Sequence, residues 1–267
     1  MCSKYAFEEF FGIVPVIRFL PIRTRYFSRL HPAPAPPEVV SYLNVLKRDG
    51  VVIIPDFLDA GAVARMRDAV PDVAEFDESP EGDGAYRYPD ADRIADFRPF
   101  FDHAIVPQIV RSYLSERAIP LHRTIGLKTR LGVIPTFEVN YHIDTWKLRV
   151  KAWLYLDYVG VENAPTVYLK GSHRGSWRYL HEARHHNYYR VDDKGFARDE
   201  DVFYVGSLWP HEIARLKNEY GYQEIVCTGK AGTLLVFDGR GLHRATPLQA
   251  NRRLILTSYW IHPGDHV

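Results

Sequence analysis

Residues 232–246 read GTLLVFDGRGLHRAT. Apolar and β-branched residues bounded by glycines predict two short strands here, 232–238 and 241–246. The second strand carries His243, an imidazole that could bind a metal ion. The stretch therefore predicts a β-rich domain and places one candidate metal ligand on it.

Two further candidate ligands lie about a hundred residues earlier, in His142-Ile143-Asp144. Residues two apart on an extended strand point to the same face, so His142 and Asp144 are expected side by side. Two imidazoles and one carboxylate form the facial triad that binds non-haem Fe(II) and leaves coordination positions open. A third ligand from a distant strand requires a fold that closes on itself, such as a β-barrel or a jelly roll. A histidine with a neighbouring carboxylate can instead be a simple ion pair at a strand end.

The flanking sequence predicts a mainly β architecture with helices at its N-terminal side. Helical spacing of apolar residues predicts a helix over 38–48, and Asp56 or Asp59 can cap a second helix that ends near Val70. Seven or eight short strands after a helical part indicate a sandwich-type barrel with the helices packed on one face. Besides the two strands above, a helix is expected over 101–117, a loop over 72–95, a buried strand over 51–54, and strands over 122–130, 135–142, 148–158, 165–169, 222–227 and 252–261.

Composition limits the organisation and the class of partner. The chain has 267 residues, 46% of them hydrophobic, which is enough for one all-β domain of ordinary size. We expect an N-terminal arm with a proline-rich connector over 1–37 and a single domain over 38–267. The long aromatic segment 173–221 within that domain is predicted to be a lid over the substrate. The net charge of +1 gives no electrostatic reason to expect nucleic-acid binding.

The N-terminal arm and the cysteines bear on location. The apolar stretch 10–22 is interrupted by Pro15, Arg18 and Pro21, so it is too broken for a transmembrane segment and is expected to pack on the domain surface. Cys2 and Cys227 are the only cysteines, and two such distant thiols favour a reduced, cytoplasmic setting over a disulfide scaffold. The sequence does not indicate the oligomeric state.

Several motifs in order resemble one family over residues 42–260. The segment Asp49–Leu58 resembles the opening strand and helix of the phytanoyl-CoA dioxygenase-like enzymes, and His142-Ile-Asp144 resembles their His-x-Asp motif. The resemblance continues through Lys151–Asp157, Asn163-Ala-Pro165, Lys170-Gly-Ser-His173, Gly232–Thr246 and Arg252–Tyr259. It implies a double-stranded β-helix, cupin-like in form, that uses Fe(II), 2-oxoglutarate and O₂. Ala245 departs from the family, which often has serine at this position.

The resemblance also implies the residues that bind the cosubstrate. An arginine on the strand over 252–261 holds the far carboxylate of 2-oxoglutarate, because a guanidinium binds a carboxylate bidentately and stays charged when buried. The family pattern favours Arg252, and Arg253 then points to the opposite face. Both can also be charges that protect a strand edge. Trp153 and Thr166 are predicted to line the same pocket, although each is equally common as an ordinary strand residue.

Four residues are predicted to contact the substrate. Lys128 and Arg130 share a face of one strand and can meet an anionic group, although a solvated face is the commoner position for such charges. Tyr188 and Tyr189 are aromatic residues of the predicted lid.

The resemblance predicts a dioxygenase that hydroxylates a C–H bond of a small organic molecule while 2-oxoglutarate is decarboxylated to succinate. The same cofactors also support desaturation or cyclisation. Halogenation is disfavoured, because halogenases of this fold replace the carboxylate ligand by a small residue and Asp144 is present. A non-catalytic, cupin-like binder of small molecules is the remaining alternative.

Overall fold

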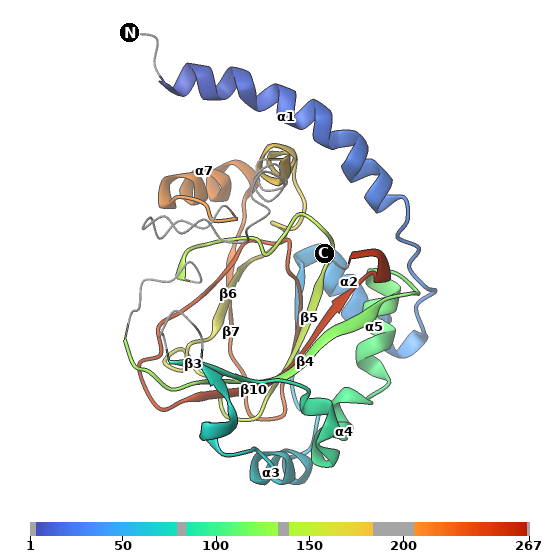
Figure 1. Cartoon of the computed structure of the whole chain (residues 1–267), viewed down its shortest axis with the longest axis vertical. Coiled ribbons are helices and arrows are strands. Elements are labelled where there is room, and N and C mark those ends of the chain that lie inside the picture. The colour runs from blue at the N-terminus through green and yellow to red at the C-terminus, as the bar shows by residue number, and fades with distance from the viewer. Residues whose placement is uncertain (1–3, 79–83, 133–138, 184–205, 266–267) are drawn as a thin grey trace.

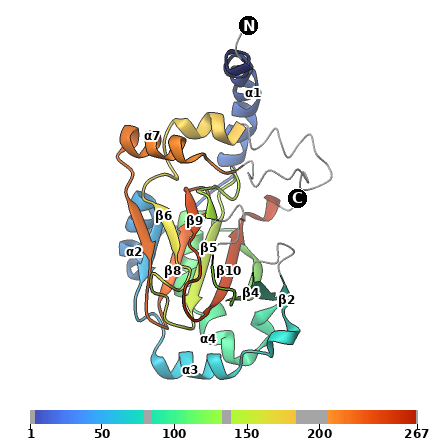
Figure 2. The same cartoon turned by 90° about the vertical axis from the view of Figure 1, so that its left-hand side faces the viewer.

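The computed structural model describes residues 4–78, 84–132, 139–183 and 206–265. The strands in these ranges form two antiparallel sheets that face each other, as the two views in Figures 1 and 2 show. The smaller sheet has the order β7-β6-β9, and it contains Glu224–Cys227, Thr166–Leu169 and His243–Ala245. The larger sheet has the order β1-β8-β5-β10-β4-β3-β2, and it contains Val51–Ile54, Leu234–Asp238, Val150–Tyr155, Arg253–Ile261, Ile119–Lys128, Ala85–Tyr88 and Asp77–Glu78.

The strands with unbroken apolar sequences are those covered on both faces. All five residues of β8 and all four of β6 are buried. Tyr155, Tyr168 and Phe237 pack between the two sheets and are fully enclosed. The predicted mainly β, jelly-roll architecture is confirmed, because the two sheets close around a shared interior.

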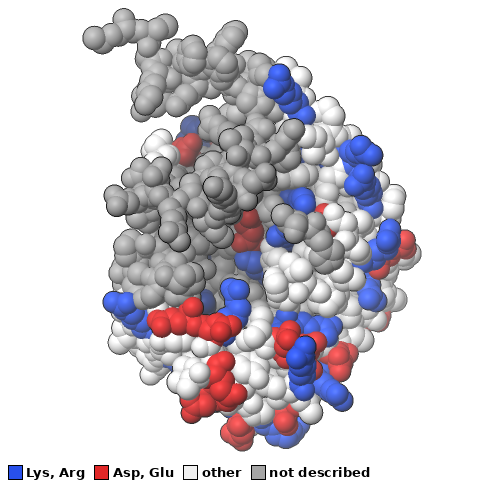
Figure 3. Space-filling view, viewed as in Figure 1, with Lys and Arg blue, Asp and Glu red and all other residues white. Residues whose placement is uncertain are grey.

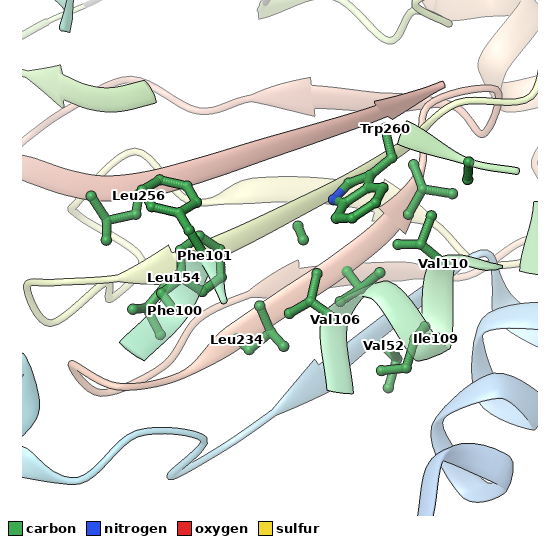
Figure 4. Close-up of a cluster of buried hydrophobic side chains, with 14 of the residues drawn as sticks. Val52, Phe100, Phe101, Val106, Ile109, Val110, Leu154, Leu234, Leu256 and Trp260 are labelled. Atoms are coloured by element: carbon green, nitrogen blue, oxygen red, sulfur yellow. The ribbon is translucent and has the colours of Figure 1, made fainter. Parts of the chain in front are cut away.

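Helices cover the outer face of the larger sheet. The helices α2 (Val40–Asp49) and α5 (Ile105–Tyr113) lie against it, with α3 (Ala60–Asp68) and α4 (Arg98–Phe101) near its end (Figure 1). Figure 4 shows side chains of α4 and α5, such as Phe101 and Val106, pointing at Leu154 and Leu234 of the sheet. Burial of this apolar surface is the main force that holds the helices in place.

Local signals set the helix ends. The Asp59 carboxylate accepts a hydrogen bond from Ala62 N at 2.8 Å and caps α3. The helix α2 ends at Gly50, which has a φ of +81°. A side chain here would collide with the Tyr168 hydroxyl and the His173 ring, so glycine is required for two reasons.

The N-terminal arm packs on the domain, as expected, but it is helical rather than broken. The helix α1 spans Lys4–Phe27 and continues through Pro15 and Pro21. A proline removes one backbone hydrogen bond and can bend a helix without ending it. Phe19 and Tyr26 hold the helix on Trp146, each with a ring-centroid distance of 5.1 Å. Among the described residues, no helix is long and apolar enough to cross a membrane.

Three local predictions differ from the structure. The helix expected over 101–117 is divided into α4 and α5, where Ile105 N donates to the His103 ring. The loop expected over 72–95 contains β2 and β3, because Ala85–Tyr88 pairs with β4. Of the strand expected over 135–142, residues 133–138 lie outside the described ranges and His142 forms only isolated bridges. Pairing with the distant strand β4 decides the second case, and a local pattern does not contain such a partner.

The helix α7 (Pro210–Tyr220) lies on the outer face of the smaller sheet. Ile213 and Leu216 of α7 pack with Val167 and Leu169 of β6. The smaller sheet is therefore also covered on both sides.

Candidate metal centre

Two backbone segments bring the three candidate ligands together. His142 and His243 form a bridge in which each backbone N–H donates to the other's carbonyl, at 3.0 and 3.1 Å. Asp144 N donates to Gly239 O at 2.9 Å. Each of the three side chains offers one ligand atom, and these atoms lie within 4.8 Å of one another. Within the described ranges this is the only such cluster.

Backbone carbonyls orient both imidazoles. His142 Nδ1 lies 2.9 Å from Asn140 O, and His243 Nδ1 lies 2.8 Å from Gly241 O. A carbonyl oxygen only accepts, so Nδ1 carries the proton on each ring. The lone pair is then on Nε2, and the Nε2 atom of His243 lies 3.5 Å from Asp144 Oδ1. Such second contacts fix the tautomer that a metal ligand needs.

The protonation states also suit a metal ion. Burial, together with the neighbouring His243, lowers the pKa of His142 to about 3. Burial alone would raise the pKa of the Asp144 carboxyl, but Lys151 and His243 hold it well below its usual range. At neutral pH His142 is therefore a neutral imidazole and Asp144 a carboxylate, the forms that bind metal. The donor set fits Fe(II).

Two neighbours hold the Asp144 carboxylate in place. Lys151 Nζ lies 2.8 Å from Asp144 Oδ1, an ion pair in which both side chains are mostly buried. A side chain at Gly239 would collide with Asp144 Oδ2. The sequence-based analysis missed both residues. The period of two along β5 could have found Lys151, because Lys151 and Trp153 share a face.

A cavity of about 390 Å³ opens beside the three ligands, and all three line it. It lies between the sheets along the inner face of β10, whose residues Arg253, Ile255, Thr257 and Tyr259 all face it. Cavities of this size hold small organic molecules.

The strand β10 corrects the choice of arginine. Arg252 lies just before the strand, outside the cavity, where its Nε donates to Asp157 Oδ2 at 3.0 Å. Arg253 lines the cavity, donates to Ala164 O and lies over the Trp153 ring at 5.7 Å. The choice of Arg252 was shifted by one residue along the strand. Tyr259 faces the cavity, and the other inward-facing residues of β10 lie an even number of positions from Tyr259, which is true of Arg253.

Only some of the other predicted pocket residues line the cavity. Trp153, Thr166 and Lys128 line the cavity. Arg130 follows the end of β4, is exposed and does not line it. Tyr188 and Tyr189 lie outside the described residues.

The described ends of the predicted lid are tied to the metal centre. Ile143 N donates to Gly206 O at 3.0 Å, and Leu208 N donates to Tyr141 O at 2.9 Å. Residues 177–183 are helical, and His181 Nε2 donates to Gly206 O at 3.1 Å. These ends therefore support the segment that carries His142 and Asp144, while residues 184–205 lie outside the described ranges.

A jelly roll with two histidines and a carboxylate at one edge of its interior defines the class of non-haem iron oxygenases. The family model described as phytanoyl-CoA dioxygenase matches residues 46–253, most of the chain. The chain therefore belongs to the phytanoyl-CoA dioxygenase family and is an iron- and 2-oxoglutarate-dependent enzyme. A search of curated proteins found no match.

Solved structures share the fold at low sequence identity. The epimerase SnoN, in a complex with Fe³⁺, α-ketoglutarate and a nogalamycin, is 18% identical, with 85% of this chain and 84% of that chain covered and a TM-score of 0.57. The carbocyclase SnoK from nogalamycin biosynthesis is 18% identical, with 86% of each chain covered and a TM-score of 0.55. HygX from Streptomyces hygroscopicus, with nickel, 2-oxoglutarate and hygromycin B bound, is 15% identical, with 83% of this chain and 86% of that chain covered and a TM-score of 0.56.

Proposed function

We propose that this enzyme hydroxylates a C–H bond of a small organic substrate, with 2-oxoglutarate decarboxylated to succinate. The observation that carries the proposal is the arrangement of the cavity, in which a triad with an intact carboxylate lies beside a separate arginine. Iron bound by His142, Asp144 and His243 supplies the activation of O₂ and the oxidising power. Asp144 occupies the position that a halogenase leaves open, so oxygen chemistry is favoured over halogenation.

The cosubstrate is assigned to the Arg253 end of the cavity. Arg253 offers the guanidinium for the far carboxylate of 2-oxoglutarate, and Lys128 stands directly opposite it in the register of β10 and β4. Thr166 adds a hydroxyl, and Trp153 supports the Arg253 side chain. Buried cationic partners of this kind bind carboxylates more strongly than exposed ones, because little water competes.

The protein controls the outcome through the position of the substrate. SnoN is described as an epimerase and SnoK as a carbocyclase, so this fold supports several fates for an oxidised C–H position. In our proposal the cavity walls hold one C–H bond toward the metal and exclude water, and hydroxylation follows.

Two measurements test the proposal. Anaerobic addition of Fe(II) and 2-oxoglutarate should produce a weak visible charge-transfer band, and its absence would leave a non-catalytic binder. A screen for compounds that stimulate succinate formation should then be repeated under ¹⁸O₂. Hydroxylation places one ¹⁸O atom in the product. An unlabelled product that has lost two hydrogens, or is epimerised, would replace hydroxylation by desaturation, cyclisation or epimerisation.

We retain residues 173–221 as the proposed substrate-contacting insertion. Their described ends form hydrogen bonds with the segment that carries His142 and Asp144, which supports a position beside the cavity. Backbone hydrogen exchange should slow in this range when substrate joins Fe(II) and 2-oxoglutarate. Unchanged exchange would assign the range a structural role. A cytoplasmic location also stays a proposal, supported by the buried free thiol of Cys227.

A further inference from the structure

The cavity has far more positive than negative charge. Asp144 is the only carboxylate among the described residues that line it. Five cationic side chains line it as well: Arg87, Lys128, Lys151, Arg244 and Arg253. Fe²⁺ and the 2-oxoglutarate dianion cancel each other, so the bound cofactors leave this excess unchanged. Elsewhere on the face shown in Figure 3, acidic and basic side chains are intermixed.

The cations separate into two groups along β10. Arg253 and Lys128 stand at one end, and Tyr259 faces His122 and Lys151 at the other. Six residues separate Arg253 from Tyr259, which is roughly 20 Å of extended strand. Lys151 binds Asp144, so the metal ligands lie beside the Tyr259 end. The 2-oxoglutarate that Arg253 anchors approaches the metal from the opposite end, so the groups around Tyr259 are left for another molecule.

At the Tyr259 end, Asp265 and Asp144 are the acidic groups that act on Arg149, and neither forms an ion pair with it. Arg149 Nη1 donates to the Tyr259 hydroxyl at 3.2 Å, and its Nε is buried without a hydrogen-bond partner. Arg149 and the exposed Arg87 form no ion pair with any described carboxylate. His122 stacks on Tyr259 with a centroid distance of 6.2 Å. Burial, Arg87 and Arg149 together lower the pKa of His122, a sign of positive potential at this point.

Together these groups match one kind of ligand. A buried guanidinium without a carboxylate is costly unless an anion accepts its hydrogen bonds. Arg87 and His122 are at the exposed rim, and Tyr259 lies deeper, so an anionic group that enters from solvent meets all three. A cationic substrate, such as an amine, would be repelled by the same charges.

We propose that the substrate carries an oxyanion, a carboxylate or a phosphate, which binds at the Tyr259 end of the cavity through Arg87, Arg149, Tyr259 and His122. That the bound molecule is a substrate rests on the proposed function, but the anion site itself can be tested without turnover. The anionic group would fix the far end of the substrate and leave its reacting carbon toward the metal, on the side opposite to the 2-oxoglutarate anchor.

The test is calorimetric titration of protein loaded with Ni(II) and 2-oxoglutarate, in which no turnover occurs and the Arg253 end is filled. Inorganic phosphate is added in one arm and acetate in the other, at low ionic strength. We expect saturable binding of one equivalent of phosphate, of acetate or of both, and the tighter ligand identifies the anionic group. Arg149→Gln and Arg87→Gln should each weaken that binding, the first by about tenfold or more.

The controls separate this site from its neighbours. Arg252→Gln removes an arginine outside the cavity and should bind the anion like the wild type. Arg253→Gln, titrated without cofactors, should keep anion binding. The proposal is wrong if the wild type binds neither anion, if Arg87→Gln and Arg149→Gln both bind as well as the wild type, or if only Arg253→Gln loses binding. The Fe(II)–2-oxoglutarate band, recorded on the same wild-type preparation, reports separately on the proposed function.

Discussion

At the residue scale, the site depends on backbone atoms as much as on side chains. Asn140 and Gly241 contribute only carbonyl oxygens, yet these select the tautomers of His142 and His243. Gly239 has no side chain, and this leaves room for the Asp144 carboxylate. The ligands themselves could be named from the sequence, because residue type and strand spacing are sufficient for that. The residues that orient them could not, because a carbonyl has no sequence signature.

The arginine assignment gives a sharp comparison of neighbours. Arg253→Leu should raise the apparent Michaelis constant for 2-oxoglutarate steeply, because the loss of one partner of a buried charge pair costs about 2–5 kcal/mol. Arg252→Leu should change it little, because Arg252 pairs with Asp157 outside the cavity. Initial rates over a range of 2-oxoglutarate concentrations decide between them. Equal effects of the two variants would contradict the assignment.

Replacement of a metal ligand should remove both iron binding and the stabilisation that it brings. Fe(II) and 2-oxoglutarate bind the native state only, so they should raise the melting temperature of the wild type. His142→Ala and His243→Ala should lose that increase and most of the bound iron, and Asp144→Gly should lose hydroxylation. Thermal melts under anaerobic conditions and iron analysis provide the measurement. Full iron content in either histidine variant would refute the triad.

At the element scale, the arm helix α1 is part of the domain through a few deep contacts. Tyr26 donates to Asp265 Oδ2 at 2.9 Å and accepts from Leu148 N at 3.1 Å, next to the start of β5. Arg23 forms an ion pair of 2.6 Å with Glu182, which also binds the buried Arg178. The helix thus braces both the strand that leads to Lys151 and the helix over 177–183. The sequence predicted surface packing but contained no sign of these partners.

Tyr26→Phe tests this brace with the loss of one oxygen atom. Leu148 N and the Asp265 carboxylate are buried and would each lose the hydrogen bond to the Tyr26 hydroxyl. The free energy of unfolding should therefore fall by about 1–3 kcal/mol. Tyr158→Phe is the matched control, because Tyr158 is 65% exposed. Urea denaturation of the two variants and the wild type measures the difference. Equal stability of all three would show that the Tyr26 hydroxyl adds nothing to the stability of the domain.

At the scale of the whole molecule, buried neutral groups make stability depend on pH. His173 connects the smaller sheet to α2 through Nε2 and Lys47 O, at 3.1 Å. Burial is the main cause that lowers the pKa of His173 from 6.5 to about 4. As pH falls from 6.5 to 4, this histidine binds a proton in the unfolded chain but stays neutral in the native state. The native state is therefore destabilised in this window, by about 3 kcal/mol for this group.

The pH prediction is read from urea denaturation of metal-free protein at pH 7 and pH 4.5. The wild type should lose stability between these values, and His173→Gln should lose less, because glutamine keeps a donor for Lys47 O and takes up no proton. His211→Gln, which replaces an exposed histidine, should behave like the wild type. If His173→Gln lost as much stability as the wild type, His173 would not be the group that titrates.

Residue types and periodicity in the sequence were enough to predict the β-rich fold, the family and the three candidate ligands. Those depend on local periodicity and residue type, which do not change when distant segments meet. Only the tertiary structure decided between Arg252 and Arg253, because one residue of strand phase reverses the face and the phase is set by pairing with β4 and β5. It alone also placed Arg87 and Lys151 on one cavity and Arg149 against Tyr259 of the same cavity. These charges come from different strands or from the segment just before β5, and the energy of a charge depends on what lies beside it in space.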